Sequence, residues 1–126
     1  KNGAVYIAPG GKHMRVVKKG TDYCIKLSDE PAIDGLRPCA NVMYESLENC
    51  QYDEITCVVL TGMGADGTKG IQGLAAHHKK LHVIAQDADT CVVYGMPKAI
   101  AQTGLVDEVV PLGSVAETIT KNVGVS

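Results

Sequence analysis

The sequence predicts an α/β domain of three layers, α/β/α, with a mainly parallel sheet between helices and an antiparallel hairpin near the N-terminus. Two continuous apolar runs, "ITCVVL" at 55–60 and "LHVIAQ" at 81–86, are typical of strands covered on both faces. A helical pattern follows each run, and strand–helix units repeated in this order imply parallel strands. The 126 residues, 45% of them hydrophobic, are enough for one core.

The N-terminal part predicts a strand, a hairpin and a helix. "GAVYIAP" at 3–9 is a short apolar run that predicts the first strand. Residues 13–27 alternate on both sides of Gly20, which predicts two antiparallel strands with one face formed by Tyr23, Ile25 and Leu27. A polar loop at 28–38 leads to a predicted helix at 39–50, whose apolar stripe contains Met43, Leu47 and Cys50.

The C-terminal part predicts strands and helices in alternation. The third strand is "VDEVV" at 106–110, and the helices lie at 70–78, 96–104 and 115–123. Pro97 in the first turn and Gly104 at the end delimit the second of these helices. Ser114, followed three residues later by Glu117, predicts a capping box that opens the last helix.

Composition argues against several functions. A net charge of −2 and the absence of Trp and Phe predict no nucleic-acid partner, and no apolar run is long enough to predict membrane insertion. An odd number of cysteines without C-x-x-C spacing is typical of free thiols in a reducing cytoplasm; they are Cys24, Cys39, Cys50, Cys57 and Cys91. His78 and His82 are four residues apart, but two lysines and a strand pattern indicate that the helix ends between them, so we expect no metal site.

The segment "LTGMGADGTKG" at 60–70 follows a predicted strand at the sheet edge where α/β proteins place their sites. Gly62, Gly64 and Gly67 spell G-x-G-x-x-G, and Asp87 lies twenty residues further on, which is a dinucleotide-binding fingerprint in outline. Asp66 opposes this interpretation, because its charge lies where a phosphate would approach the helix N-terminus. A Rossmann-like module that binds a dinucleotide or phosphate with this loop remains the alternative.

Two other interpretations centre on Asp66. As an N-cap, its carboxylate would accept hydrogen bonds from the amides of the helix that follows, and the glycines would serve turn geometry. A carboxylate held in this way would also suit the acid of a Ser-His-Asp triad, with a free backbone N–H in the same turn stabilising an oxyanion.

The stretches "VYIAPGGKHM", "VVLTGMGADGTKG" and "IAQDADTCVVYGMPKAIAQTGLVDEVVPL" resemble the catalytic domain of the CheB-type chemotaxis methylesterases, from about Gly3 to the last helix. The resemblance implies that residues 1–126 are the C-terminal portion of that domain, in a cytoplasmic protein-glutamate methylesterase and glutamine deamidase without a cofactor. Its implied partners are the methylated cytoplasmic helices of chemoreceptors and a receiver domain of the same parent chain.

The resemblance also assigns residues. It makes Asp66 the triad acid and the backbone N–H of Met63 an oxyanion-hole donor. It implies that the nucleophilic serine and the histidine lie upstream of Lys1, so we expect the chain alone to be inactive and to expose a sheet edge where upstream strands would pair. His13 would line the site or be structural. Cys39 and Asn41 stand where the family often has Ser and Asp, which leaves their family role open.

Overall fold

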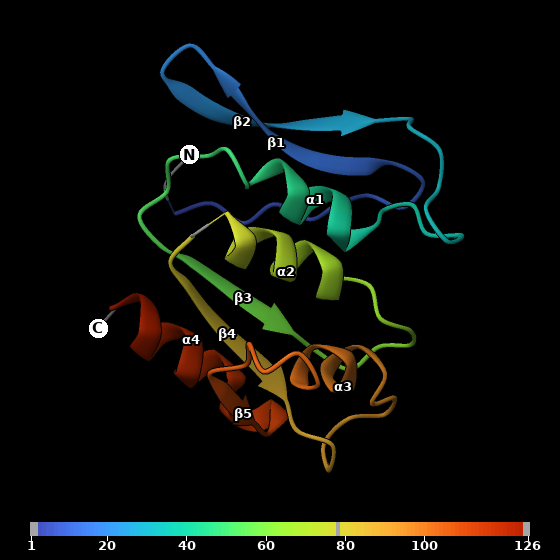
Figure 1. The fold of residues 1–126 in the computed structure, drawn as a ribbon, viewed down its shortest axis with the longest axis vertical. Coiled ribbons are helices and arrows are strands. Elements are labelled where there is room, and N and C mark those ends of the chain that lie inside the picture. Colours follow the sequence, from blue (N-terminus) through green and yellow to red (C-terminus); the bar gives the residue numbers. More distant parts are fainter. Residues whose placement is uncertain (1–2, 78, 125–126) are drawn as a thin grey trace.

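A parallel three-stranded sheet forms the centre of the structure, a computed structural model that describes residues 3–77 and 79–124. Its strands lie in the order β3-β4-β5, and both neighbouring pairs are parallel (Figure 1). The strands are β3 (Ile55–Val59), β4 (Leu81–Gln86) and β5 (Glu108–Val110). The predicted parallel sheet is therefore confirmed.

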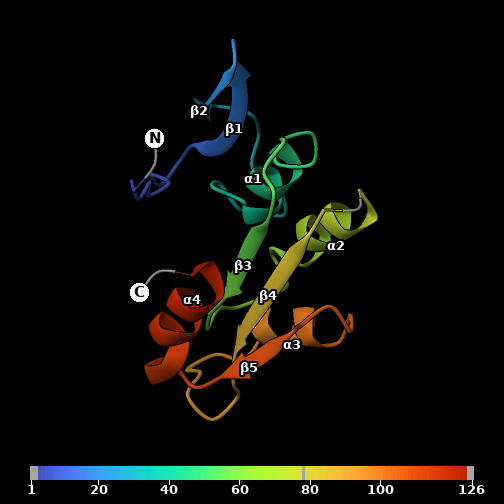
Figure 2. The ribbon, with the colours of Figure 1, turned by 90° about the vertical axis from the view of Figure 1, so that its left-hand side faces the viewer.

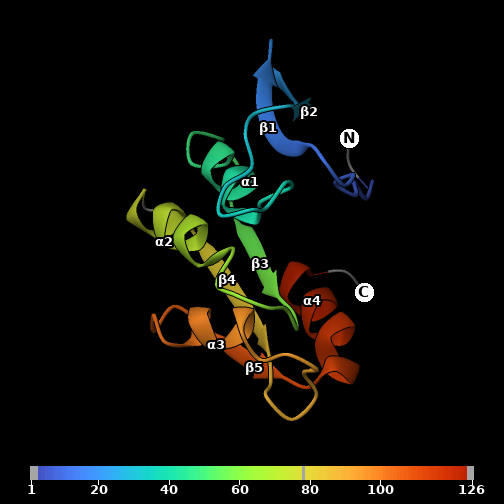
Figure 3. The same cartoon turned by 90° about the vertical axis from the view of Figure 1, so that its right-hand side faces the viewer.

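Helices cover both faces of this sheet. Figures 2 and 3 show α2 (Thr68–Ala76) and α3 (Met96–Ala101) on one face and α4 (Val115–Val123) on the other. A fourth helix, α1 (Ala40–Ser46), packs against α2 beyond the start of β3. The three-layer prediction is thus confirmed. Within the described residues, no helix has the length and apolar character needed to cross a bilayer.

The predicted hairpin is also present. β1 (His13–Lys19) pairs with β2 (Asp22–Ser28) in antiparallel register. The hairpin lies beside α1, away from the sheet (Figure 1), and the N–H of Val16 donates to Ser46 Oγ at 2.8 Å. On its predicted apolar face, Tyr23 and Ile25 are half-buried, whereas Leu27 is exposed.

The main core lies between the sheet and the helices of one face. Cys57, Val59, Val83 and Ala85 of the strands pack with Tyr44, Leu47, Cys50, Ile71, Leu74 and Ile100. The predicted stripe of α1 contributes to this core, although the helix itself ends at Ser46. The helix is shorter than predicted, and Leu47 and Cys50 are buried in the segment that follows it.

The predicted first strand at 3–9 is wrong, since the structure has no strand there. Val5 and Ile7 are 89% and 87% exposed. An apolar run forms a strand only where a neighbouring strand accepts its backbone hydrogen bonds, and no strand in the described residues pairs with this segment. The outer edge of β3 is likewise without a partner strand in the part of the chain that the structure describes.

The predicted capping box at Ser114 is wrong as well. The Ser114 side chain makes no cap hydrogen bond, because a 3₁₀ turn, η1 (Leu112–Ser114), leads directly into α4. Ser114 has φ −106° and ψ −2°, whereas a capping serine adopts an extended backbone. The spacing of Ser114 and Glu117 correctly marks the start of α4, but the preceding 3₁₀ turn prevents the backbone conformation that a capping serine requires.

Helices α1 and α2 approach most closely at Gly70. A Cβ added to Gly70 would lie 2.6 Å from Tyr44 Cβ and 3.1 Å from Asn41 Cα. These atoms belong to the backbone and the base of a side chain, so they cannot move without shifting α1. A side chain at this position is therefore excluded by packing and not by backbone conformation.

We predict that Gly70→Ala lowers the free energy of unfolding by about 1–3 kcal/mol, the usual cost of forcing extra volume into a packed contact. Gly73→Ala is the matched control on the same helix, because its new Cβ would meet only the mobile end of Glu48, with Oε1 at 2.7 Å. Denaturant unfolding of both variants measures the difference. Equal stabilities would contradict the proposed close contact.

Candidate functional site

The loop between β3 and α2 is fixed by hydrogen bonds to the start of α3. The carbonyl of Gly62 accepts from Gly95 N at 3.1 Å and from Met96 N at 2.9 Å. A Cβ on Gly62 would lie 2.5 Å from Met96 Sδ, and one on Gly95 would lie 2.7 Å from Gly62 O. Gly95 is therefore required for the close approach of the two segments, because its Cβ would meet backbone atoms, whereas a Cβ on Gly62 would clash only with the flexible Met96 side chain.

The Asp66 carboxylate binds the N-terminus of α1. Its Oδ2 accepts from Ala40 N at 2.7 Å, and its Oδ1 accepts from Asn41 N at 3.0 Å and from Cys39 Sγ at 3.1 Å. The prediction that Asp66 caps the following helix is wrong: α2 starts from Gly67, with φ +96° and no side-chain cap from that residue. A carboxylate at a helix N-terminus was expected, but the helix is a different one.

Asn41 completes a reciprocal arrangement. Its Oδ1 accepts from Gly67 N at 2.9 Å and from Gly70 N at 2.8 Å, so an α1 side chain satisfies two amides at the start of α2. Sequence reasoning left the role of Asn41 open. Asn in the first turn of a helix is a signal for local capping, but it does not reveal a partner helix about 26 residues away.

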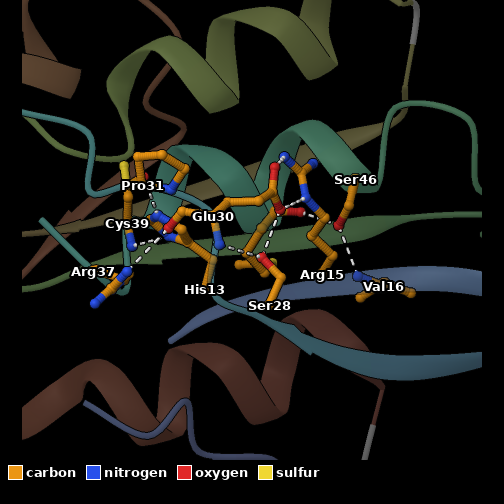
Figure 4. Close-up of polar contacts among 10 residues, drawn as sticks. His13, Arg15, Val16, Ser28, Glu30, Pro31, Arg37, Cys39 and Ser46 are labelled. Atoms are coloured by element: carbon orange, nitrogen blue, oxygen red, sulfur yellow. Dashed lines mark hydrogen bonds and ion pairs between the residues drawn. The ribbon is translucent and has the colours of Figure 1, made fainter. Parts of the chain in front are cut away.

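His13 binds the backbone at the N-terminus of α1. It is fully buried, and its Nδ1 accepts from Cys39 N at 3.2 Å. Nε2 therefore carries the ring proton and donates to the carbonyl of Pro31, 3.0 Å away (Figure 4). Of the two roles left open for His13, these contacts support the structural one.

The loop before α1 is anchored by an ion pair at the surface. The Arg15 guanidinium donates to both carboxylate oxygens of Glu30, from Nε at 2.8 Å and from Nη2 at 3.0 Å (Figure 4). This pair and a hydrogen bond from Ser28 lower the pKa of Glu30 to about 2. The pair thus remains formed at neutral pH, and it ties the hairpin to the segment that leads to Cys39.

Cys39 acts as a donor at this site. The side chain is buried, and burial together with the hydrogen bond to Asp66 raises the pKa of its thiol. The thiol therefore keeps its proton at neutral pH and donates it to the carboxylate. Because the thiolate is the nucleophilic form of cysteine, the local environment does not favour Cys39 as a nucleophile.

Space and hydrogen-bonding capacity remain beside Asp66. Asp66 and Cys39 both line two neighbouring hollows of about 590 and 290 Å³. An ionised carboxylate has about four acceptor positions, and donors within the described residues occupy two on Oδ1 and one on Oδ2. Oδ2 can therefore accept one further hydrogen bond.

Met63 lies in the same loop and lines the larger hollow. Its side chain is 84% exposed. Within residues 3–77 and 79–124, no acceptor meets its backbone N–H. The arrangement thus combines a fixed carboxylate with a free backbone donor at the carboxyl end of a parallel strand.

The remaining candidate ligands do not gather at this site. His78 lies outside the described residues, and His82 Nε2 lies 2.6 Å from Glu108 Oε2. No group of three potential metal ligands occurs in the described part of the chain. All five cysteines are free thiols, as predicted: Cys39, Cys50 and Cys57 are buried, Cys91 is half-buried and Cys24 is exposed.

The fold and the site define an α/β domain with an acidic residue at the carboxyl edge of its parallel sheet. The chain belongs to the CheB methylesterase family, whose model matches residues 1–119. The crystal structure of the Thermotoga maritima CheB methylesterase catalytic domain is similar, with a TM-score of 0.84 and 33% identity over 92% of this chain and 60% of that one.

Curated relatives agree with this family. A protein-glutamate methylesterase/protein-glutamine glutaminase of Desulfotalea psychrophila is 44% identical over 123 residues, and one of Oceanobacillus iheyensis is 43% identical over 122 residues. Each alignment covers 96% of this chain, but only 33% and 34% of the relatives. The chain thus spans about a third of their length.

The site gives one direct prediction about the loop backbone. Gly64 has φ +84°, and a Cβ there would have no atom within 4 Å. Gly64→Val should therefore cost about 1–2 kcal/mol of stability through backbone strain alone, and activity in the complete protein should fall with it. Thermal unfolding measures the cost, with Gly64→Asn as a better tolerated control. Wild-type melting of the Val variant would contradict this account.

Proposed function

We propose that this chain is the C-terminal part of the catalytic domain of a cytoplasmic protein-glutamate methylesterase and protein-glutamine glutaminase. The parent protein would hydrolyse methyl esters on glutamates of chemoreceptor cytoplasmic helices, under control of a receiver domain in the same chain. Asp66 is the triad acid in this proposal, and Met63 N–H is an oxyanion donor. The nucleophilic serine and the histidine come from parent residues upstream of Lys1.

The observation that carries this proposal is the geometry of Asp66. Three donors fix its carboxylate, and one acceptor position on Oδ2 remains at the border of a hollow. A triad acid needs this combination: it must be rigid, and it must still accept the Nδ1–H of a histidine. A merely structural cap would have no need for the remaining position.

The proposed reaction uses these groups in sequence. The serine oxygen attacks the ester carbonyl while the histidine takes its proton, and Asp66 stabilises the imidazolium and fixes its orientation. Met63 N–H stabilises the oxyanion. The histidine then returns the proton to the departing methanol, and a water molecule hydrolyses the acyl-enzyme to release the glutamate carboxylate.

The phosphate-binding alternative has weaker support. A phosphate cradle requires free N–H groups at the start of the helix. Two of these amides, Gly67 N and Gly70 N, already donate to Asn41 Oδ1. Occupying them with a phosphate would require breaking the contact between α1 and α2. Calorimetry with NAD or inorganic phosphate tests the alternative, and we expect no binding.

In the complete protein, Asp66→Asn should cost about 1 kcal/mol of stability, because an amide nitrogen cannot accept from the α1 backbone as a carboxylate oxygen does, but the protein should still fold. Esterase turnover should fall by roughly three to four orders of magnitude, because the wrong histidine tautomer would be held. Methanol release from methylated receptor measures turnover, and circular dichroism measures folding. Near-normal activity in this variant would remove Asp66 from the triad.

The 126-residue chain alone should release no measurable methanol from methylated receptor. Triad members act as a unit, and an isolated carboxylate with an oxyanion donor retains little of the catalysis. The complete protein serves as the positive control. Release that survives repurification and is lost in Asp66→Ala would point to a nucleophile within this chain and contradict the proposal.

A further inference from the structure

Asn41 is the residue through which α1 and the glycine loop hold each other. Its backbone N–H donates to Asp66 Oδ1 at 3.0 Å, and its side-chain Oδ1 accepts from Gly67 N at 2.9 Å and Gly70 N at 2.8 Å. One residue thus binds both the Asp66 carboxylate and the backbone immediately after it. Among the described residues, no other residue forms hydrogen bonds to both.

The hydrogen bond from Gly67 N to Asn41 Oδ1 fixes the peptide group that follows Asp66. Gly67 N belongs to the peptide group that joins Asp66 to Gly67, so fixing this N–H fixes the plane of the peptide next to the Asp66 Cα. Gly67 has φ +96°, in a region that favours glycine, so this residue is free to rotate if the bond is lost. The three donors on the carboxylate hold it only if the loop presents it correctly.

We infer that Asn41 is a positioning residue for Asp66: its side-chain oxygen holds the Asp66–Gly67 peptide so that the carboxylate meets both α1 and its reaction partner. As far as it concerns catalysis, this inference rests on the proposed function. Asn41 touches neither substrate nor reacting atoms in this role, and it acts only through the loop backbone.

The role of the Asn41 side-chain oxygen can be tested with two substitutions. Asn41→Ala removes the acceptor for Gly67 and Gly70, whereas Asn41→Asp keeps an oxygen acceptor of the same length. Ser46→Ala is the matched structural control, because Ser46 Oγ on the same helix accepts a backbone hydrogen bond from Val16 and does not contact the loop. Each alanine variant loses two hydrogen bonds of an α1 side chain, but only Asn41→Ala loses bonds to the loop that carries Asp66.

The experiment compares kcat, KM and Tm of the complete protein in these three variants, with methanol release from methylated receptor well below Tm. Asn41→Ala should lower kcat by about a hundredfold with little change in KM, the typical effect of misplacing a reactive group by about 1 Å. The kcat of Asn41→Asp should be at least about tenfold higher than that of Asn41→Ala. Ser46→Ala should lower Tm and leave kcat unchanged. A kcat of Asn41→Ala equal to that of Ser46→Ala would overturn the inference.

A second readout separates this inference from the proposed function. In ¹⁵N–¹H spectra of the 126-residue chain, Asn41→Ala should speed the hydrogen exchange of the Ala40 amide, which binds Asp66 Oδ2, and Asn41→Asp should restore most of its protection. Unchanged protection of the Ala40 amide in Asn41→Ala would overturn the positioning role. If the wild-type complete protein released no methanol, the proposed function would fail, and this amide alone would decide the inference.

Discussion

Two helix N-termini meet at the Asp66–Asn41 pair, and the site depends on the hydrogen bonds between them. The first turn of any helix leaves N–H groups without intrahelical acceptors. For α1 these groups donate to Asp66 and, at Cys39 N, to His13. For α2 they donate to Asn41. The loop before α2 supplies acceptors for the first-turn N–H groups of α1, and α1 supplies an acceptor for those of α2. Loss of a single cap of this kind costs about 1 kcal/mol.

The same constraint explains the glycine density of the loop. Gly64 and Gly67 adopt positive φ, and Gly70 lets α1 contact α2. The loop is therefore a connector that brings the N-termini of α1 and α2 together at the Asp66–Asn41 pair, while Gly62 O binds the start of α3. In this way a short chain segment holds a charged group rigidly at the sheet edge.

Much of this structure could be predicted from the sequence, because the pattern of apolar residues shows which segments are buried. The buried strands β3 and β4 and the hairpin follow directly from it, as does the place of Asp66 at the end of β3. The partner of Asp66 could not be predicted in this way. Capping rules compare residues three or four positions apart, whereas Ala40 and Asp66 are 26 positions apart. The strand predicted at 3–9 was wrong for a related reason, since an apolar run does not reveal whether another strand pairs with it.

Native-state hydrogen exchange of the 126-residue chain tests the central claim most directly. The Ala40 and Asn41 amides lie in the first turn of α1, and within the described residues Asp66 is the acceptor for both. They should be protected to the level of the α1 core. Lys69 is the internal reference, because its amide in the first turn of α2 has no acceptor within the described residues. Fast exchange of Ala40 and Asn41, at the rate of Lys69, would contradict the claim that the Asp66 carboxylate holds α1.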